Sequence, residues 1–259
     1  MSQPYLPPEL LSLIADLLQD TDDALKTCCL VSKSWIPRTR RHLFAEVVFR
    51  TDKDLQSWKT TFPNPITSPA YYTRTLFINF CPVAIAGPEE SGWILTFSRA
   101  VCFGIGGSSK PATDLLPFHG FSPMLKYLHL VFTTLPSPHV FNFICSFPLL
   151  EDLCLVTTGD VFDAGGGFGG GPVVVRSSSP PPFTGMLMLS LKMGMNPITS
   201  QLLSLPMGPH FRKLRFRWYS REDALPTTTL VEKCSPTLEF LRIDTSIPGT
   251  SSWHLHSHG

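Results

Sequence analysis

The feature that most restricts the fold is a short apolar pattern that recurs along most of the chain. Each unit has the spacing apolar-x-x-apolar-x-apolar, with a weaker match at Thr73, where the first position is not apolar. The units begin, in chain order, at Thr73, Ala100, Leu125, Leu150, Met186, Phe211 and Leu238. Neighbouring starts are 25 to 27 residues apart, except for one gap of 36 residues before Met186. A constant step of this length indicates a chain built from small units, each of which stacks on the one before it.

This pattern resembles that of leucine-rich repeats. In such repeats each unit adds one strand to a parallel sheet and returns through a helical or irregular segment. The resemblance implies an α/β fold, an irregular leucine-rich-repeat-like solenoid with a parallel sheet over residues 71–249. Val131, Val156 and Lys192 stand at or near the place where a regular repeat has Asn or Cys, so its asparagine ladder is missing here. The alternative is an ordinary domain whose strands are evenly spaced by chance.

Strand alternation predicts which side chains of each unit are buried. Because one unit buries too little apolar surface to be stable alone, we expect Leu128, Leu153 and Leu241 to share one continuous core. The residues between the apolar positions are expected on the concave face, which in the Met186 unit includes Leu187. This strip is chemically mixed and suits a protein target. Its candidate target-binding residues are Tyr127, Asp152, Lys213, Arg215, Arg217 and Phe240.

The first fifty residues predict three short helices. Leu10, Ile14 and Leu17 recur at three- and four-residue steps, as on one face of an amphipathic helix. A polar break at 19–23 offers candidate N-caps for a second helix, and a third short helix follows Pro37. Helices this short are marginal alone, so they must pack on one another or on a partner.

The same segment resembles an F-box. The resemblance rests on Leu6-Pro7-x-Glu9-Leu10 and on Leu30-Val31-Ser32-Lys33-x-Trp35, while Arg41-His42-Leu43-Phe44 is similar to an ending common in fungal F-box proteins. It implies a three-helix module at 1–50 that docks on a Skp-type adaptor and, through the adaptor, on a cullin. The positions that match implied adaptor contacts are Leu6, Pro7, Glu9, Leu10, Ile14, Leu17, Leu25, Cys28, Leu30, Val31, Ser32 and Trp35.

Together the two resemblances imply a substrate-receptor subunit of an SCF-type (Skp–cullin–F-box) E3 ubiquitin ligase. Such a subunit binds a protein target through its repeats, catalyses nothing itself and needs no cofactor or metal. We expect a linker at 51–70 and a disordered tail at 250–259. Two alternatives stay open: an F-box scaffold outside any cullin complex, and a repeat protein that binds nucleic acid or a phosphopeptide through the basic strand 212–217.

The basic strand has two interpretations. Lys213, Arg215 and Arg217 alternate with apolar residues, as in a half-buried strand. Three cations on one face could bind an acidic peptide, a phosphopeptide or RNA. The simpler interpretation is a solvated face whose charges keep a sheet edge from aggregating. A second basic cluster, at 38–41, is expected on the solvated side of the third helix.

The rest of the chain argues against catalytic, membrane and metal-binding functions. A net charge of +1 supplies no global field for nucleic acid or membrane, and seven scattered cysteines suggest reduced thiols of the cytoplasm or nucleus. Three prolines interrupt the uncharged stretch 127–150, which argues against a membrane span.

The Gly-, Ser- and Pro-rich run 163–182 predicts a disordered insert, because no helix follows its formal G-x-G-x-x-G match. Alternating histidines at 254–258 indicate a frayed tail rather than a metal site.

Overall fold

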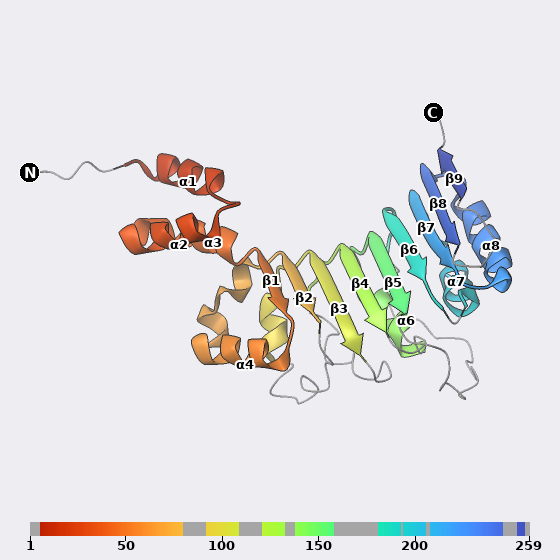
Figure 1. Cartoon of the computed structure of the whole chain (residues 1–259), viewed down its shortest axis with the longest axis horizontal. Coiled ribbons are helices and arrows are strands. Elements are labelled where there is room, and N and C mark those ends of the chain that lie inside the picture. The colour runs from red at the N-terminus through yellow and green to blue at the C-terminus, as the bar shows by residue number, and fades with distance from the viewer. Residues whose placement is uncertain are drawn as a thin grey trace, which may run out of the picture.

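The computed structural model describes residues 6–79, 92–108, 121–132, 138–157, 181–192, 194–205, 208–245 and 253–256. These residues form an α/β fold, in which a nine-stranded sheet runs along the molecule and three helices project from its N-terminal end (Figure 1). The strands lie side by side in chain order, and all neighbouring pairs are parallel except the last. The predicted α/β class with a parallel sheet is confirmed.

The strands fall where the apolar units predict them, and one more strand precedes the first unit. They are β1 (Glu46–Phe49), β2 (Thr75–Ile78), β3 (Cys102–Ser108), β4 (Tyr127–Phe132), β5 (Asp152–Thr157), β6 (Met186–Ser190), β7 (Lys213–Trp218), β8 (Phe240–Thr245) and β9 (Trp253–His256). The helices are α1 (Pro8–Leu17), α2 (Asp22–Val31), α3 (Ile36–Leu43), α4 (Asp52–Thr61), α6 (Pro138–Cys145), α7 (Asn196–Leu203) and α8 (Ala224–Cys234). Short 3-10 turns occur at Lys33–Trp35, Pro65–Thr67, Pro69–Tyr72, Leu95–Phe97 and Arg221–Asp223.

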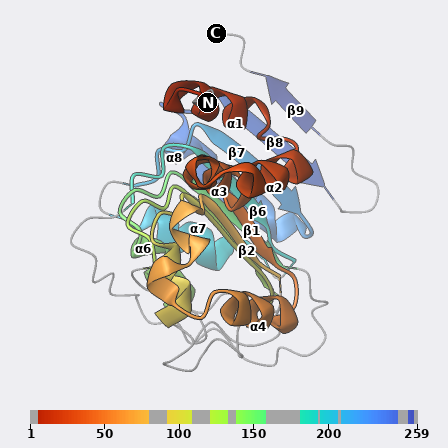
Figure 2. The same ribbon diagram turned by 90° about the vertical axis from the view of Figure 1, so that its left-hand side faces the viewer.

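One face of the sheet carries the helices that return the chain between strands. Side chains of α4, α6, α7 and α8 are buried in the same core as the inward side chains of the strands. Figure 2 shows α6, α7 and α8 on one side of the strands. No helix among the described residues packs on the opposite face, which we call the concave face.

The core is a row of aligned apolar residues that crosses the sheet. Backbone pairing aligns Leu128 with Leu153 and Leu214 with Leu241, as the repeat predicts. Leu128 and Leu153 are buried, whereas Leu241 is half-buried because it lies on the last parallel strand. The row consists of Val47, Leu76, Phe103, Leu128, Leu153, Leu187, Leu214 and Leu241.

The predicted register of one unit is wrong by two residues. Leu187, and not Leu189, pairs with Leu153 on one side and Leu214 on the other. Leu187 is fully buried, so its expected place on the concave face is also wrong. Leu187, Leu189 and Leu191 alternate along the strand, and a shift of two residues keeps each on the same face. The apolar pattern therefore fits both registers, and only backbone pairing distinguishes them.

A main-chain ladder connects the units at the start of each strand. The carbonyl of Ala45 accepts the N–H groups of Arg74 and Thr75 at 2.8 and 2.9 Å, and the carbonyl of Arg74 accepts two N–H groups from the next unit. The same paired acceptance recurs along the sheet. The carbonyls that accept two N–H groups in this way are those of Ala45, Arg74, Val101, Lys126, Gly185 and Arg212. This ladder satisfies backbone groups that would otherwise lack partners.

The expected linker at 51–70 is instead a packed part of the domain. Thr51 and Asp54 form a capping box that starts α4. Leu55 is buried in the core, and the Trp58 ring lies 5.7 Å from the Phe49 ring. Apolar residues at these helix positions bury surface that a solvated linker would leave exposed. The sheet also begins earlier than expected, since β1 lies inside the predicted 1–50 module.

Two further expectations concern the Gly-, Ser- and Pro-rich insert and the C-terminal tail. The insert 163–182 lies outside the described residues except for Pro181 and Pro182. The tail 250–259 contains β9, which pairs antiparallel with β8, so the expectation of disorder is wrong for 253–256. Backbone pairing with an open strand edge supplies partners that the sequence pattern did not predict. Among the described residues, no helix has the length and apolar character needed to cross a membrane.

Replacing Leu153 by Ala tests the continuous core. The side chain of Leu153 is 1 % exposed, so its truncation leaves a cavity, and we expect unfolding to become easier by about 2–5 kcal/mol. Leu149→Ala is the matched control, because Leu149 is exposed just before the same strand, and we expect a change well below about 1 kcal/mol. Urea unfolding of both variants measures the difference. Equal effects would contradict the assigned inward face.

Candidate interaction surfaces

The three N-terminal helices form a small bundle of their own. Leu11 and Ala15 of α1, Leu25 of α2 and Thr39 of α3 are its buried residues. The bundle lies beyond β1, the first strand of the sheet (Figure 1). Because so few side chains are buried, apolar packing alone holds α1 weakly.

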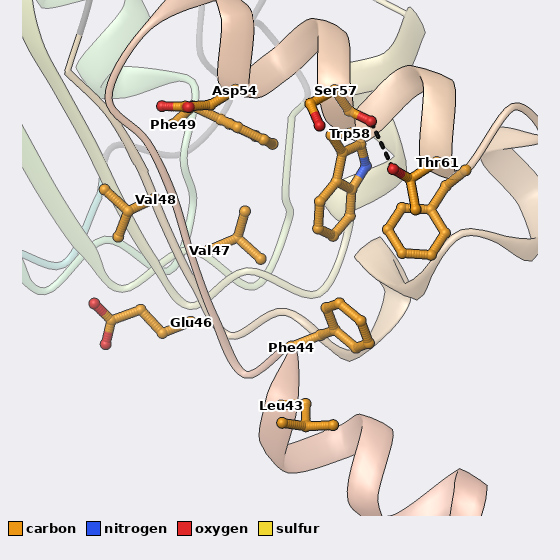
Figure 3. Close-up of a pocket in the computed structure, with 11 residues that line it drawn as sticks. Leu43, Phe44, Glu46, Val47, Val48, Phe49, Asp54, Ser57, Trp58 and Thr61 are labelled. Carbon is orange, nitrogen blue, oxygen red and sulfur yellow. Dashed lines mark hydrogen bonds between the residues drawn. The ribbon is translucent and has the colours of Figure 1, made fainter. Parts of the chain in front are cut away.

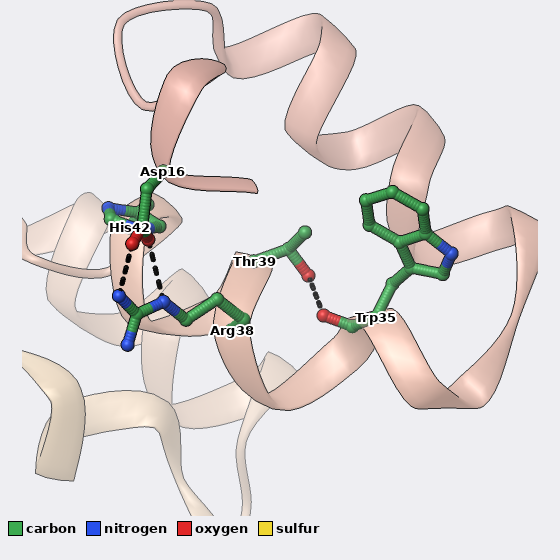
Figure 4. A network of polar contacts seen from close by, with 5 residues as sticks. All are labelled: Asp16, Trp35, Arg38, Thr39 and His42. Carbon is green, nitrogen blue, oxygen red and sulfur yellow. Dashed lines mark hydrogen bonds and ion pairs between the residues drawn. The ribbon is translucent and has the colours of Figure 1, made fainter. Parts of the chain in front are cut away.

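A polar network joins α1 to α3. The Asp16 carboxylate accepts hydrogen bonds from the Arg38 guanidinium, with Nε to Oδ1 at 2.6 Å and Nη2 to Oδ2 as the second contact (Figure 4). The His42 ring nitrogen Nε2 lies 2.6 Å from Asp16 Oδ1. The hydrogen bond from Arg38, followed by that from His42, lowers the pKa of Asp16 to about 2.

This network corrects the expected role of the basic cluster at 38–41. Arg38 binds a carboxylate of another helix, whereas Arg40 and Arg41 are exposed as expected. Nothing in the pattern of the sequence pairs Asp16 with a cation 22 residues away. The aligned turns of α1 and α3 bring these two side chains together.

The residues implied to contact an adaptor fall into three groups. Leu25 is buried between the helices, so it stabilises the bundle and cannot contact a partner. The half-buried residues are Ile14, Cys28 and Trp35. The exposed ones are Leu6, Pro7, Glu9, Leu10, Leu17, Leu30, Val31 and Ser32. Ser32 Oγ accepts the N–H of Ser34 and so caps the 3-10 turn that follows α2.

The end of α2 carries two of the three most exposed apolar residues of this group, and Leu17 of α1 is the third. Leu30 is 88 % exposed and Val31 is 70 % exposed. A groove of about 300 Å³ lies between α1 and the start of α3, with Leu11, Trp35 and Pro37 in its walls. Apolar side chains exposed together with a groove are typical of surfaces that bind another protein.

A second groove marks the junction between the bundle and the sheet. It has a volume of about 450 Å³ and lies between β1 and α4. Phe44, which follows α3, packs against Trp58 with ring centroids 5.8 Å apart, and both side chains line the groove (Figure 3). Asp54 Oδ2 accepts the N–H groups of Arg50 and Thr51 in the cap of α4. The contacts of this groove therefore favour a structural role.

The concave face presents all six candidate target-binding residues. Tyr127, Lys213 and Arg217 are exposed, and Asp152, Arg215 and Phe240 are half-buried. Backbone pairing places Tyr127 beside Asp152 and Lys213 beside Phe240. The face is therefore open to a partner, but its residues do not form one cluster.

Asp152 has a structural contact that the sequence did not predict. Its Oδ1 accepts the N–H of Met186 and so joins the starts of β5 and β6. A Cβ atom at Gly185 would overlap this carboxylate, which explains why glycine suits that position. One oxygen of Asp152 is therefore engaged within the chain.

Arg215 belongs to a cluster that spans two strands. Its Nη2 lies 3.5 Å from Asp244 Oδ2, and Arg242 Nε lies 3.0 Å from Asp244 Oδ1. Arg242 and Asp244 were missing from the candidate residues. Arg242 occupies the same position in its unit as Arg215 does in the preceding unit. An alignment of the units could therefore have identified Arg242 as a candidate.

The simpler interpretation of the basic strand is correct about the solvated face, since Lys213 and Arg217 are exposed, but wrong about the sheet edge. β7 lies between β6 and β8, so its charges do not protect a sheet edge. An interior strand already has a neighbour on each side, and edge pairing is not available to it.

The cysteines and histidines form no reactive centre among the described residues. No group of His, Cys, Asp and Glu side chains there could hold a metal ion. Burial raises the pKa of Cys145 to about 12 and that of Cys154 to about 11, and both thiols therefore stay protonated at neutral pH.

No protein-family model matches the chain, and no curated protein matches it in sequence.

An NMR titration tests the network that joins α1 to α3. Since the pKa of Asp16 is lowered from 3.8 to about 2, the network stabilises the fold fully above about pH 3.8 and loses this effect as the pH falls toward about 2. We expect the Asp16 carboxyl to titrate near pH 2, and nearer to 3.8 in Arg38→Gln. Arg41→Gln, an exposed arginine of the same helix, is the control and should leave the titration unchanged. An unaltered Asp16 titration in Arg38→Gln would contradict the network.

Proposed function

We propose that this chain is the substrate-receptor subunit of an SCF-type E3 ubiquitin ligase. The observation that carries the proposal is the exposure of Leu30 and Val31 on a small helical bundle that lies apart from the body of the sheet. In the F-box resemblance these two residues belong to the motif that faces the Skp-type adaptor. Large apolar side chains left in water at a motif of this kind favour a partner that buries them.

The arrangement of the two surfaces supports the same function. The bundle stands at the β1 end of the sheet, and the concave face extends along all the parallel strands to β8 (Figure 1). In the proposed complex the leucine-rich-repeat-like sheet holds a protein target while the bundle holds the adaptor and, through it, a cullin. The receptor then raises the effective concentration of the target near the ubiquitin-loading machinery.

Two other functions make different predictions. An F-box scaffold would bind the adaptor without a cullin, and co-purification of a cullin with the full chain distinguishes the two. A nucleic-acid-binding repeat protein would bind through the cations of β7, and its affinity would fall steeply with salt concentration. The mixed charge of the concave face, which includes Asp152 and Asp244, favours a protein target over a nucleic acid.

The double variant Leu30→Asp plus Val31→Asp tests adaptor binding. Two charges placed in an apolar interface would be buried without partners, so we expect loss of binding to a purified Skp-type adaptor by at least about 100-fold. The matched control is Leu225→Asp on α8, because Leu225 is 77 % exposed and lies at the other end of the sheet. Calorimetry with the full chain measures both affinities. Unchanged adaptor affinity in the double variant would overturn the proposed function.

A further inference from the structure

The concave face of β7 and β8 carries a concentration of positive charge. Lys213, Arg215 and Arg217 alternate along β7, and Arg242 pairs with Arg215 across the sheet. We call these four residues the arginine patch. Lys213 and Arg217 are exposed, and the side chains of Arg215 and Arg242 are 38 % and 37 % exposed.

A single carboxylate, that of Asp244, contacts both Arg215 and Arg242. Among the described residues, Asp244 is the only acidic residue in contact with Arg215 or Arg242. Burial would raise the pKa of Asp244, but its hydrogen bonds to the two guanidinium groups outweigh burial and hold the pKa below its ordinary value. Asp244 is therefore ionised at neutral pH, and it leaves the patch with an excess of positive charge.

The two guanidinium groups keep most of their hydrogen-bonding capacity. A guanidinium has five N–H donors in a fixed fork, and Asp244 accepts one hydrogen bond from Arg215 and one from Arg242. Asp244 also holds the two groups close together, because it contacts both. This arrangement suits a second anion that lies between the two arginines.

An apolar strip lies beside the arginines on the same face. Backbone pairing aligns Cys154 with Met188, and Met188 with Arg215. Both side chains are half-buried, and burial keeps the Cys154 thiol neutral at physiological pH by raising its pKa. The patch is therefore bounded on one side by surface that suits an apolar side chain.

We propose that the arginine patch binds an extended peptide segment through an anionic side chain, a carboxylate or a phosphate, next to an apolar residue that lies on Cys154 and Met188. If the proposed function holds, this peptide belongs to the target. Neighbouring strands lie about 4.8 Å apart, and side chains two residues apart in an extended chain lie on one side of it, about 7 Å from each other, so such a pair can reach both parts of the site. A nucleic acid fits less well, because the cations occupy only two strands and the net charge of the chain is +1.

Fluorescence anisotropy with the full chain tests the site. The probes are labelled eight-residue peptides that contain a leucine beside two glutamates, two phosphoserines or two glutamines, together with a single-stranded RNA of eight nucleotides. We expect a glutamate or phosphoserine peptide to bind at least about tenfold more tightly than the glutamine peptide. A preference for glutamate indicates an acidic segment, and a preference for phosphoserine indicates a phosphorylated one.

Charge-neutral variants locate the binding. We expect Arg215→Gln plus Arg242→Gln to weaken binding of the anionic peptide about tenfold or more. Arg40→Gln plus Arg41→Gln removes the same charge from exposed positions on α3 and should change affinity less than about twofold. Should the first variant not fold, Lys213→Gln plus Arg217→Gln removes exposed cations of the same patch and should also weaken binding.

The variant Asp244→Asn distinguishes a patch that binds an anion from one whose charges only stabilise the sheet. Removal of the resident carboxylate frees both guanidinium groups, so we expect tighter binding of the anionic peptide by about threefold or more. Equal affinity for the anionic and glutamine peptides, tighter binding of RNA, or weaker binding by Asp244→Asn in a folded protein would each overturn the proposal. Peptide binding is measured without the adaptor. A negative result would therefore contradict the peptide site alone, and the adaptor-binding experiment would still test the proposed ligase function.

Discussion

The structure depends on the main-chain hydrogen bonds that join each unit to the next at the starts of the strands. From Ala45 before β1 to Arg212 before β7, one carbonyl accepts two N–H groups from the next unit at every parallel junction except that of β5 and β6. There the Asp152 carboxylate accepts the second N–H group. A unit removed from the stack would lose these bonds on both sides, which is why the units are stable only together. Side-chain pairs that solvent still reaches, such as Lys126 with Glu151 at 2.7 Å, add little to this.

Because the ladder and the inward row hold the stack, most positions on the concave face can vary without loss of the fold. The aligned row on that face changes from Val48 and Phe77 near the bundle to Arg215 and Arg242 near β8. The Phe77 ring lies so close to Gly104 that a Cβ atom there would overlap it, so even the apolar end of this row is shaped by backbone contact. Different strands thus offer different chemistry on one continuous surface, as a receptor for a peptide or protein requires.

The bundle depends on polar and aromatic contacts because its apolar core is small. Asp16 and Arg38 hold α1 against α3, and Phe44 packs on Trp58 where the bundle meets the sheet. These contacts let Leu30 and Val31 remain exposed without loss of the fold, since neither contributes to the core. The same division recurs in the sheet, where inward residues hold the structure and outward residues are available to partners. The proposed ligase function needs both free surfaces at once.

The sequence by itself determined the period of the units, the α/β class and the inward face of Leu128 and Leu153, because strand alternation and burial act on local patterns. It predicted neither the register of Leu187 nor the packing of α4. It also named Arg215 without Arg242 and Asp244, and Arg38 without Asp16. Only the tertiary structure decided this register, this packing and these ion-pair partners, because each depends on which distant backbone segments lie side by side. A two-residue shift leaves an alternating pattern unchanged, and an ion pair between remote segments leaves no periodic signal in the chain.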